Sequence, residues 1–279
     1  MAVLLGLAGA ISFGGLDFLG GQASKRSAVA SVVIATQVVA LALAVVVVTV
    51  DDVPVPSGGD IALTIAGGMV GMVSLGLLFQ GLATGRMGVV APVTAVLAAV
   101  IPLGWALARG ERPGGLALTG VLVALASVAL VAREPDADDA RRGLARPLTL
   151  ALLAGAGFGV AISVFSEVAD GTGYWVLFFN RVGSVTVFGT ALLATGRLTR
   201  IEPGDRVPVL LAGALNVVGD AAVMEGFRQG LTSIVAPVAN LAPAITVLLA
   251  FAILKERLQR HQLVGVAGAV AGLALIAGG

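Results

Sequence analysis

Two oppositely charged side chains lie deep inside consecutive apolar stretches of this chain. Arg181 lies seven residues after the start of the stretch 174–195. Asp220 lies seven residues before the end of the next stretch, 207–227, and Asn216 is one helical turn before it on the same face. At about 1.5 Å per helical residue, both charged groups are roughly 10 Å from the same surface. A charge at the centre of a bilayer costs roughly 2.5–3.5 kcal/mol, so we expect the two groups to pair.

Two interpretations of this pair stay open at the level of sequence. The first is a buried ion pair that only closes the structure. The second is a gate or an anion anchor, which Asp220 occupies until a substrate or a proton arrives. In the second case Arg181, Asn216 and Asp220 belong to a binding site for a small solute.

Asp17 is another carboxylate inside an apolar stretch. It lies about five residues before the end of the stretch 3–22. Gln37 lies about six residues after the start of the stretch 31–50, so the two side chains share a depth near the opposite surface. Desolvation favours the neutral form of an acid without a fixed base, which suits the transfer of a coupling proton. The alternative is a protonated Asp17 that bonds Gln37 or nearby backbone.

Polar side chains also lie beside prolines in two similar segments. Thr94 follows Pro92, and Asn240 lies between Pro237 and Pro243. A proline inside a helix frees a backbone carbonyl, which lipid tolerates only where a neighbour or a cavity satisfies it. We therefore expect helix kinks at these prolines and a polar or zwitterionic solute bound beside them. The alternative is that both polar side chains only hydrogen-bond neighbouring helices.

The residues needed for most enzyme chemistry are missing from this sequence. The chain has no Cys and a single His, His261, which excludes thiol nucleophiles, zinc-thiolate sites and His clusters. Val217 and Val218 precede Gly219-Asp220, which departs from the Gly-x-Gly-Asp signature of membrane aspartyl proteases. A net charge of +1 gives no general attraction to nucleic acid. We expect no enzyme activity, no metal and no cofactor.

Composition places the chain in the membrane. It is 58% hydrophobic and 12% charged, with a mean hydropathy of +1.03. Apolar stretches of about 20 residues predict an all-α membrane protein with ten transmembrane helices. The expected spans are 3–22, 31–50, 61–83, 88–108, 114–132, 147–168, 174–195, 207–227, 231–254 and 262–278, of which the fifth and the tenth are short.

An internal repeat organises these ten spans. Residues 81–132 align without a gap on 226–277, a shift of 145 residues, with 18 identities in 52 positions. The chain therefore divides into two five-helix repeats, 1–132 and 147–279, joined by the charged linker 133–146. Because five is odd, the second repeat inserts upside down, which predicts inverted repeats with a binding site at their interface.

Basic residues in the connections predict the orientation. Thirteen lie on one side of the membrane and three on the other, so we expect both chain ends outside the cell. The thirteen are Lys25, Arg26, Arg86, Arg133, Arg141, Arg142, Arg146, Arg197, Arg200, Arg206, Lys255, Arg257 and Arg260, and the three are Arg109, Arg112 and Arg228.

The repeated motifs resemble one known family. Ala91-Pro92-Val93 and Ala236-Pro237-Val238 each run on to a Glu-Arg pair, at 111–112 and 256–257. Together with the segment Leu16 to Gly21 in the expected span 3–22, these motifs make the chain resemble the EamA-domain group of the drug/metabolite transporter superfamily. This resemblance implies a ten-helix secondary transporter, most often an exporter of amino acids, metabolites or toxic compounds. Relatives are thought to keep both ends in the cytoplasm, and helix 2 has Gln37 where relatives often have arginine.

The combined expectation is a secondary transporter in the cell membrane. We expect alternating-access export of a small polar or amino-acid-like solute, with protons as coupling partner and Asp17 as their carrier. The lipid bilayer is the other partner, and the chain is expected to be a monomer or a homodimer. A non-transporting membrane sensor or accessory subunit and a multidrug efflux carrier are the alternatives.

Overall fold

The chain forms an all-helical bundle. The computed structural model describes all residues except 51, 111, 113, 132–144, 170, 230–234, 236–237, 257 and 279, and its described part contains no strand. The helices are α1 (Ala2–Ala23), α2 (Val29–Thr49), α3 (Gly58–Thr84), α4 (Met87–Ala108), α5 (Gly115–Val131), α7 (Ala145–Phe165), α8 (Trp175–Ala194), the short 3₁₀ helix η1 (Pro203–Asp205), α9 (Arg206–Arg228), α11 (Ala242–Leu254) and α12 (Arg260–Gly278).

Most of these helices are long and apolar enough to cross a membrane. Eight meet both conditions among the described residues, and the apolar segments Gly115–Leu130 and Ala242–Leu254 are shorter. A helix satisfies its own backbone hydrogen bonds, which is why apolar spans fold as helices in lipid. The membrane class predicted from composition is therefore confirmed.

The ninth expected span differs from the prediction. We expected one helix over 231–254, but Asn240 and Leu241 form a turn and α11 begins only at Ala242. Pro243 lies in the first turn of α11, where the missing backbone N–H has no helical partner to lose. Pro243 therefore begins a helix and does not kink one, which corrects our expectation. Pro237 lies outside the described residues.

Small residues bring the helices close together. A side chain at Gly120 of α5 would lie 2.7 Å from the carbonyl oxygen of Gly272 in α12, so only glycine allows this approach. Gly67 and Gly71 of α3 likewise face Phe165 and Ala161 of α7. The small residues Gly67 and Gly71 on α3 and Gly272 on α12 thus lie at helix interfaces.

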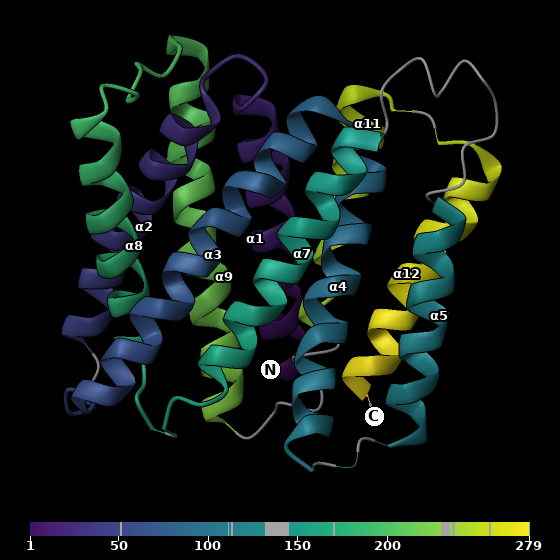
Figure 1. Ribbon diagram of the computed structural model, residues 1–279, viewed down its shortest axis with the longest axis horizontal. Helices are drawn as coiled ribbons and strands as arrows, with labels where there is room; N and C mark the ends of the chain where they lie inside the picture. Colours follow the sequence, from purple (N-terminus) through teal and green to yellow (C-terminus); the bar gives the residue numbers. More distant parts are fainter. Residues whose placement is uncertain are drawn as a thin grey trace.

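The helix neighbours combine the two halves of the chain. The helix α9 packs against α1 and α2, and α3 packs against α7 and α8. The helix α4 packs against α7, and α11 packs against α1. Figure 1 shows α5 and α12 as a pair at one side of the bundle, in contact with each other.

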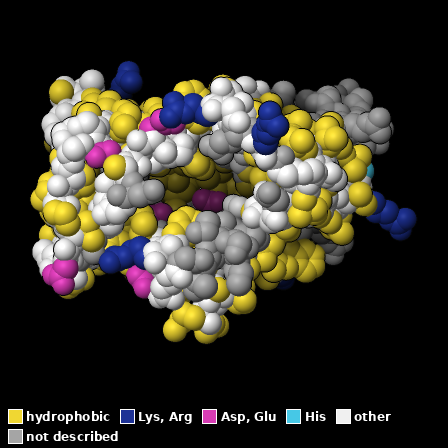
Figure 2. All heavy atoms as spheres, turned by 90° about the horizontal axis from the view of Figure 1, so that it is seen from below, with side chains coloured by type: hydrophobic (Ala, Val, Ile, Leu, Met, Phe, Trp, Pro, Cys, Tyr) yellow, Lys and Arg dark blue, Asp and Glu magenta, His cyan; other side chains and the backbone are white. Residues whose placement is uncertain are grey.

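The connections fall on two faces. On the basic face, α1 is followed by α2, α3 by α4, α8 by α9 and α11 by α12. On the hollow face, α2 is followed by α3, α4 by α5 and α7 by α8, and α1 begins and α12 ends there (Figure 1). Figure 2 views the molecule from the hollow face. The centre of this face is hollowed, and acidic side chains are visible in its depth between hydrophobic ones.

Candidate functional site

Arg181 and Asp220 form an ion pair between α8 and α9. Nη2 of Arg181 donates to Oδ2 of Asp220 at 2.5 Å, and Nη1 donates to the Leu177 carbonyl oxygen at 3.0 Å. The side chain of Arg181 is 2% exposed, whereas that of Asp220 is 25% exposed. The contact predicted from equal depths is confirmed. The unequal exposure places the carboxylate on the open side of the pair.

Asn216 extends this pair to α2. Its Oδ1 accepts from Nη2 of Arg181 at 3.1 Å, and its Nδ2 donates to Oε1 of Gln37 at 3.1 Å. Arg181, Asp220, Asn216 and Gln37 therefore form one connected set of side chains, which we call the Arg181 network. Three helices, α2, α8 and α9, supply its members.

The position of Gln37 corrects a sequence-based expectation. We expected Gln37 beside Asp17 and apart from Arg181, but its side-chain oxygen binds Asn216. Measured from the basic face, Gln37 lies roughly 12 Å along α2 and Asn216 roughly 15 Å along α9. Assigning residues to leaflets was too coarse, because long side chains near the middle of the membrane reach across several ångströms.

The guanidinium of Arg181 retains an unused donor. Its Nε is buried and has no hydrogen-bond partner. A buried donor without an acceptor costs about 1–3 kcal/mol, so a ligand oxygen at this place would recover that free energy. The planar fork of a guanidinium matches a carboxylate, which accepts two parallel hydrogen bonds. The Arg181 network is therefore suited to bind an anionic group.

Asp17 is half-buried, and its carboxylate makes no hydrogen bond or ion pair with Gln37 or with any other described side chain. Gly14, one turn before it, packs against Ala242 and Ile245 of α11, and Gly20, one turn after it, packs against Phe79 of α3. This part of α1 therefore faces other helices.

The polar residues near the prolines do not join the Arg181 network. Thr94 is buried, and its hydroxyl donates to the Ala151 carbonyl oxygen at 3.2 Å, which ties α4 to α7. Pro92 is buried inside α4. Asn240 is exposed in the turn before α11. For Thr94 the alternative of a bond between helices is the one that the structure favours.

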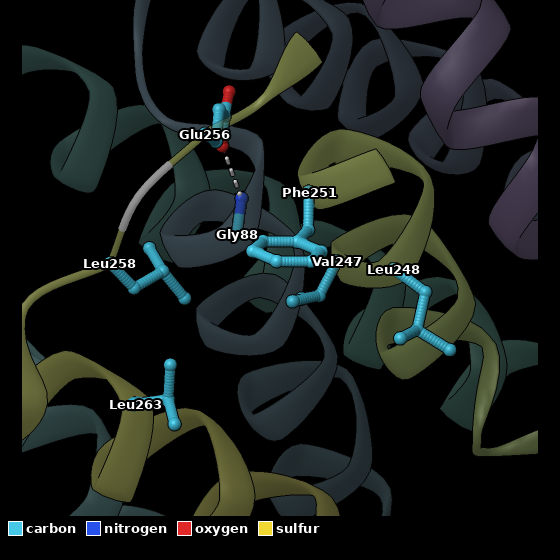
Figure 3. Close-up of a pocket in the computed structure, with 7 residues that line it drawn as sticks. All are labelled: Gly88, Val247, Leu248, Phe251, Glu256, Leu258 and Leu263. Atoms are coloured by element: carbon cyan, nitrogen blue, oxygen red, sulfur yellow. Dashed lines mark hydrogen bonds between the residues drawn. The ribbon is translucent and has the colours of Figure 1, made fainter. Parts of the chain in front are cut away.

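A carboxylate that the sequence marked only as part of a repeated motif holds the start of α4. Glu256 accepts hydrogen bonds from the backbone nitrogens of Met87 and Gly88, each at 3.2 Å. Figure 3 shows this contact at one end of an apolar cavity of about 500 Å³ between α4, α11 and α12. The lining residues are Gly88, Val247, Leu248, Phe251, Glu256, Leu258 and Leu263. The repeated Glu-Arg motif marked Glu256, but only the fold reveals its partner.

Comparison with known proteins identifies the family. Residues 145–278 match the model of the EamA-like transporter family. The chain is an EamA-domain protein. One solved structure, described only as the crystal structure of a protein, superposes with a TM-score of 0.65 at 15% identity, over 98% of this chain and 95% of that chain. At this identity the likeness concerns the fold alone. No curated protein is a significant sequence match.

The residues that match the family model include most of the Arg181 network. The EamA-like domain contains Arg181, Asn216 and Asp220, and Gln37 is the one member of the network from the first half. Together with the apolar spans, the match makes this EamA-domain protein a multi-pass membrane protein.

Proposed function

We propose that this EamA-domain protein is a secondary active transporter that exports a small amino-acid-like solute by alternating access. The observation that carries the proposal is the buried Arg181, with a free Nε and a partly exposed partner, Asp220. A solute carboxylate would take the free donor and compete with Asp220 for the guanidinium. Arg181 then exchanges the Asp220 carboxylate for the solute carboxylate, and its charge is never left unpaired.

The proposed mechanism uses the exposure difference inside the pair. Asp220 neutralises Arg181 while the site is empty, because a lone guanidinium at this depth would be costly. A bound carboxylate replaces it, and Asn216 and Gln37 keep the guanidinium and the helices α2 and α9 aligned. When the solute leaves, Asp220 restores the pair and the site is ready for another cycle.

We further propose ten transmembrane helices in two inverted repeats, 1–132 and 147–279, joined by 133–146. A shift of 145 residues carries Val29–Thr49 onto 174–194, and α8 is Trp175–Ala194. The same shift carries Gly115–Val131 onto 260–276, and α12 is Arg260–Gly278. The helix contacts follow the same symmetry, since α3 with α7 and α8 corresponds to α9 with α1 and α2. These regularities among the described helices support the repeat.

Proton coupling through Asp17 is part of the proposal. Its half-buried carboxylate lies on a face of α1 that meets α3 and α11, and no described residue supplies a fixed base. An acid in such a place binds and releases a proton more easily than one locked in an ion pair. Export against a gradient would use this proton, while Arg181 would bind the solute.

Counterflow tests the transport proposal. Proteoliposomes are loaded with an unlabelled mixture of amino acids and diluted into the same mixture carrying a radiolabel. The wild-type protein should accumulate label transiently, and Arg181→Lys should lose most of it because lysine cannot form the planar fork. Asn180→Ala, in the same turn of α8 but outside the network, is the matched control and should retain counterflow. Equal label in protein-containing and empty vesicles would reject an amino-acid-like solute.

A further inference from the structure

Two aspartates separated by the repeat distance hold equivalent positions on opposite faces. Asp60 lies in the first turn of α3 on the hollow face, and Asp205 immediately precedes α9 on the basic face. The 145-residue shift carries one onto the other. Each aspartate therefore stands at the start of the third helix of its half of the chain.

Asp205 fastens the start of α9 to the α1–α2 connection. Its carboxylate accepts from the Ser27 hydroxyl at 2.8 Å and from Nε of Arg26 at 3.0 Å, and Nη2 of Arg26 donates to the same carboxylate. Asp205 is 0% exposed. The Ser27 hydroxyl also accepts from the backbone nitrogen of Glu202 at 3.1 Å. A buried carboxylate with three donors fixes the position of these segments relative to each other.

Asp60 fastens the start of α3 in the corresponding way. Its Oδ1 accepts from the backbone nitrogen of Ala169, in the α7–α8 connection, at 3.0 Å. Its Oδ2 accepts from the Ser57 hydroxyl at 2.7 Å, and the Ser57 oxygen accepts from the Asp60 backbone nitrogen at 3.2 Å. The start of the third helix of the first half is thus tied to the connection between the first two helices of the second half, by a contact that is more exposed than that of Asp205.

A second contact accompanies each aspartate. On the basic face, the backbone nitrogen of Thr199 donates to the Ser31 hydroxyl oxygen at 3.0 Å, which joins the α8–α9 connection to α2. On the hollow face, Nε1 of Trp175 donates to the Val53 carbonyl oxygen at 2.9 Å, which joins α8 to the α2–α3 connection. The α8–α9 connection is therefore attached to α2, against which α9 packs. The α2–α3 connection is attached to α8, against which α3 packs.

We infer that the chain contains two rigid bodies, each of three helices drawn from both halves. The first body is α1, α2 and α9, and the second body is α3, α7 and α8. Asp205 and Asp60 are positioning residues that hold the third helix of each body to its partners. The inference rests on the proposed function in one respect, since it identifies these two bodies as the parts that move during transport.

The two fastenings do not behave as gates. A gate contact exists on one face at a time, because a carrier closes one side while it opens the other. The Asp60 and Asp205 contacts are both formed in the same structure, one on each face. Contacts that are closed on both faces together belong inside the moving parts.

The Arg181 network, by contrast, crosses between the two bodies. Arg181 belongs to α8 in the second body, and Asn216 and Asp220 belong to α9 in the first. Gln37 of α2 also belongs to the first body. A solute that displaces Asp220 from Arg181 thus acts at the boundary where the bodies meet, and it changes the free energy of their relative position.

Four labelling sites at helix ends test the two bodies. The chain has no Cys, so nitroxide labels attach only at the two cysteines that each variant introduces. Val50 and Gly59 lie near the hollow face, and Leu193 and Val207 lie near the basic face, all of them exposed. Val50→Cys with Val207→Cys reports on the first body, and Gly59→Cys with Leu193→Cys on the second. Exchanging partners gives two pairs between the bodies, 50 with 193 and 59 with 207.

Double electron–electron resonance in nanodiscs measures each pair. Asp220→Asn, which removes the charge partner of Arg181 at the boundary, should shift the peak of both between-body distributions by more than the width of a within-body distribution. The within-body peaks should not shift. Equal shifts in all four pairs, or no shift between the bodies, would overturn the inference.

The aspartates themselves give the crossed control. Asp205→Asn should broaden the 50–207 distribution and leave 59–193 unchanged, and Asp60→Asn should do the reverse. If either substitution broadened both pairs or neither, the aspartates would not position the bodies. These distances require no solute, so a protein that fails counterflow yet shows this pattern loses the proposed solute and not the two bodies.

Discussion

Arg181 is almost completely buried, yet it donates to a carboxylate, Asp220, that keeps a quarter of its side chain exposed. The free-energy cost of losing the partner is therefore larger for Arg181 than for Asp220. A guanidinium stays charged at any physiological pH and is costly to leave alone at this depth, whereas a partly exposed carboxylate keeps some contact with water and can also be neutralised by a proton. This asymmetry determines the order of several expected effects.

The first prediction concerns stability. Asp220→Ala leaves a buried, unpaired guanidinium and should destabilise the protein by about 3–5 kcal/mol. Arg181→Met with Asp220→Ala removes both charges and should cost less than Asp220→Ala alone. Thermal unfolding in detergent measures the order of the two variants. A double variant that melts below the single variant would show that the pair contributes through packing and not through charge.

The second prediction concerns the amide that joins two helices. Asn216 contacts both Arg181 and Gln37, so Asn216→Ala should break both links at once. The double variant Asn216→Ala with Gln37→Ala should therefore be about as stable as Asn216→Ala alone, with a coupling of about 0.5–3 kcal/mol. A double-mutant cycle from thermal melts measures this coupling. Additive effects would mean that Gln37 acts independently of the network.

Sequence reasoning found the ion pair because both charged residues could be placed at one depth. The helices α8 and α9 are consecutive and antiparallel, so counting residues from a shared surface was enough to bring Arg181 and Asp220 together. It failed for Gln37, whose partner Asn216 lies 179 residues away in the other half of the chain. Nothing in the sequence states that α9 packs against α2.

The same limit applies to the contacts that hold the helix ends. Glu256 binds Gly88 across 168 residues, and Arg26 binds Asp205 across 179. The repeat identified Glu256 as part of a motif, and the shift of 145 residues relates Asp60 to Asp205, but neither pattern names a partner. Such partners are brought together because helices of one half of the chain pack against helices of the other half, which only the folded structure shows.

A third prediction concerns the start of α4. The carboxylate of Glu256 accepts from two backbone N–H groups that have no partner within the helix. Glu256→Ala should cost about 1 kcal/mol, a typical value for a lost helix cap, and Glu256→Gln should cost less because the amide oxygen still accepts. Melting temperatures of the two variants check this order. Exposed Glu202, which caps no helix with its side chain, is the control position.

A fourth prediction concerns orientation. The basic face should lie in the cytoplasm, so both chain ends and the hollow face should lie outside. A phosphatase fused after the last residue should be active, and a fluorescent protein fused there should be dark. Bright cytoplasmic fluorescence would place the ends inside, as the family resemblance implies, and the hollow of Figure 2 would then open to the cytoplasm.

The last prediction separates the proton from the solute. Asp17→Asn keeps the size and hydrogen-bonding capacity of the side chain but cannot change its charge. Asp17 lies on α1 and makes no bond to Gln37, so the substitution should leave the Arg181 network and its solute binding intact. The variant should therefore retain counterflow of the labelled amino-acid mixture, which needs no proton gradient. It should lose uphill accumulation driven by a pH difference across the proteoliposome membrane. Ser12→Ala, a neighbouring buried change on the same helix, controls for general damage to α1 and should retain both activities. If Asp17→Asn still accumulates solute against a gradient with an unchanged pH dependence, Asp17 is structural and Asp220 becomes the candidate for proton coupling.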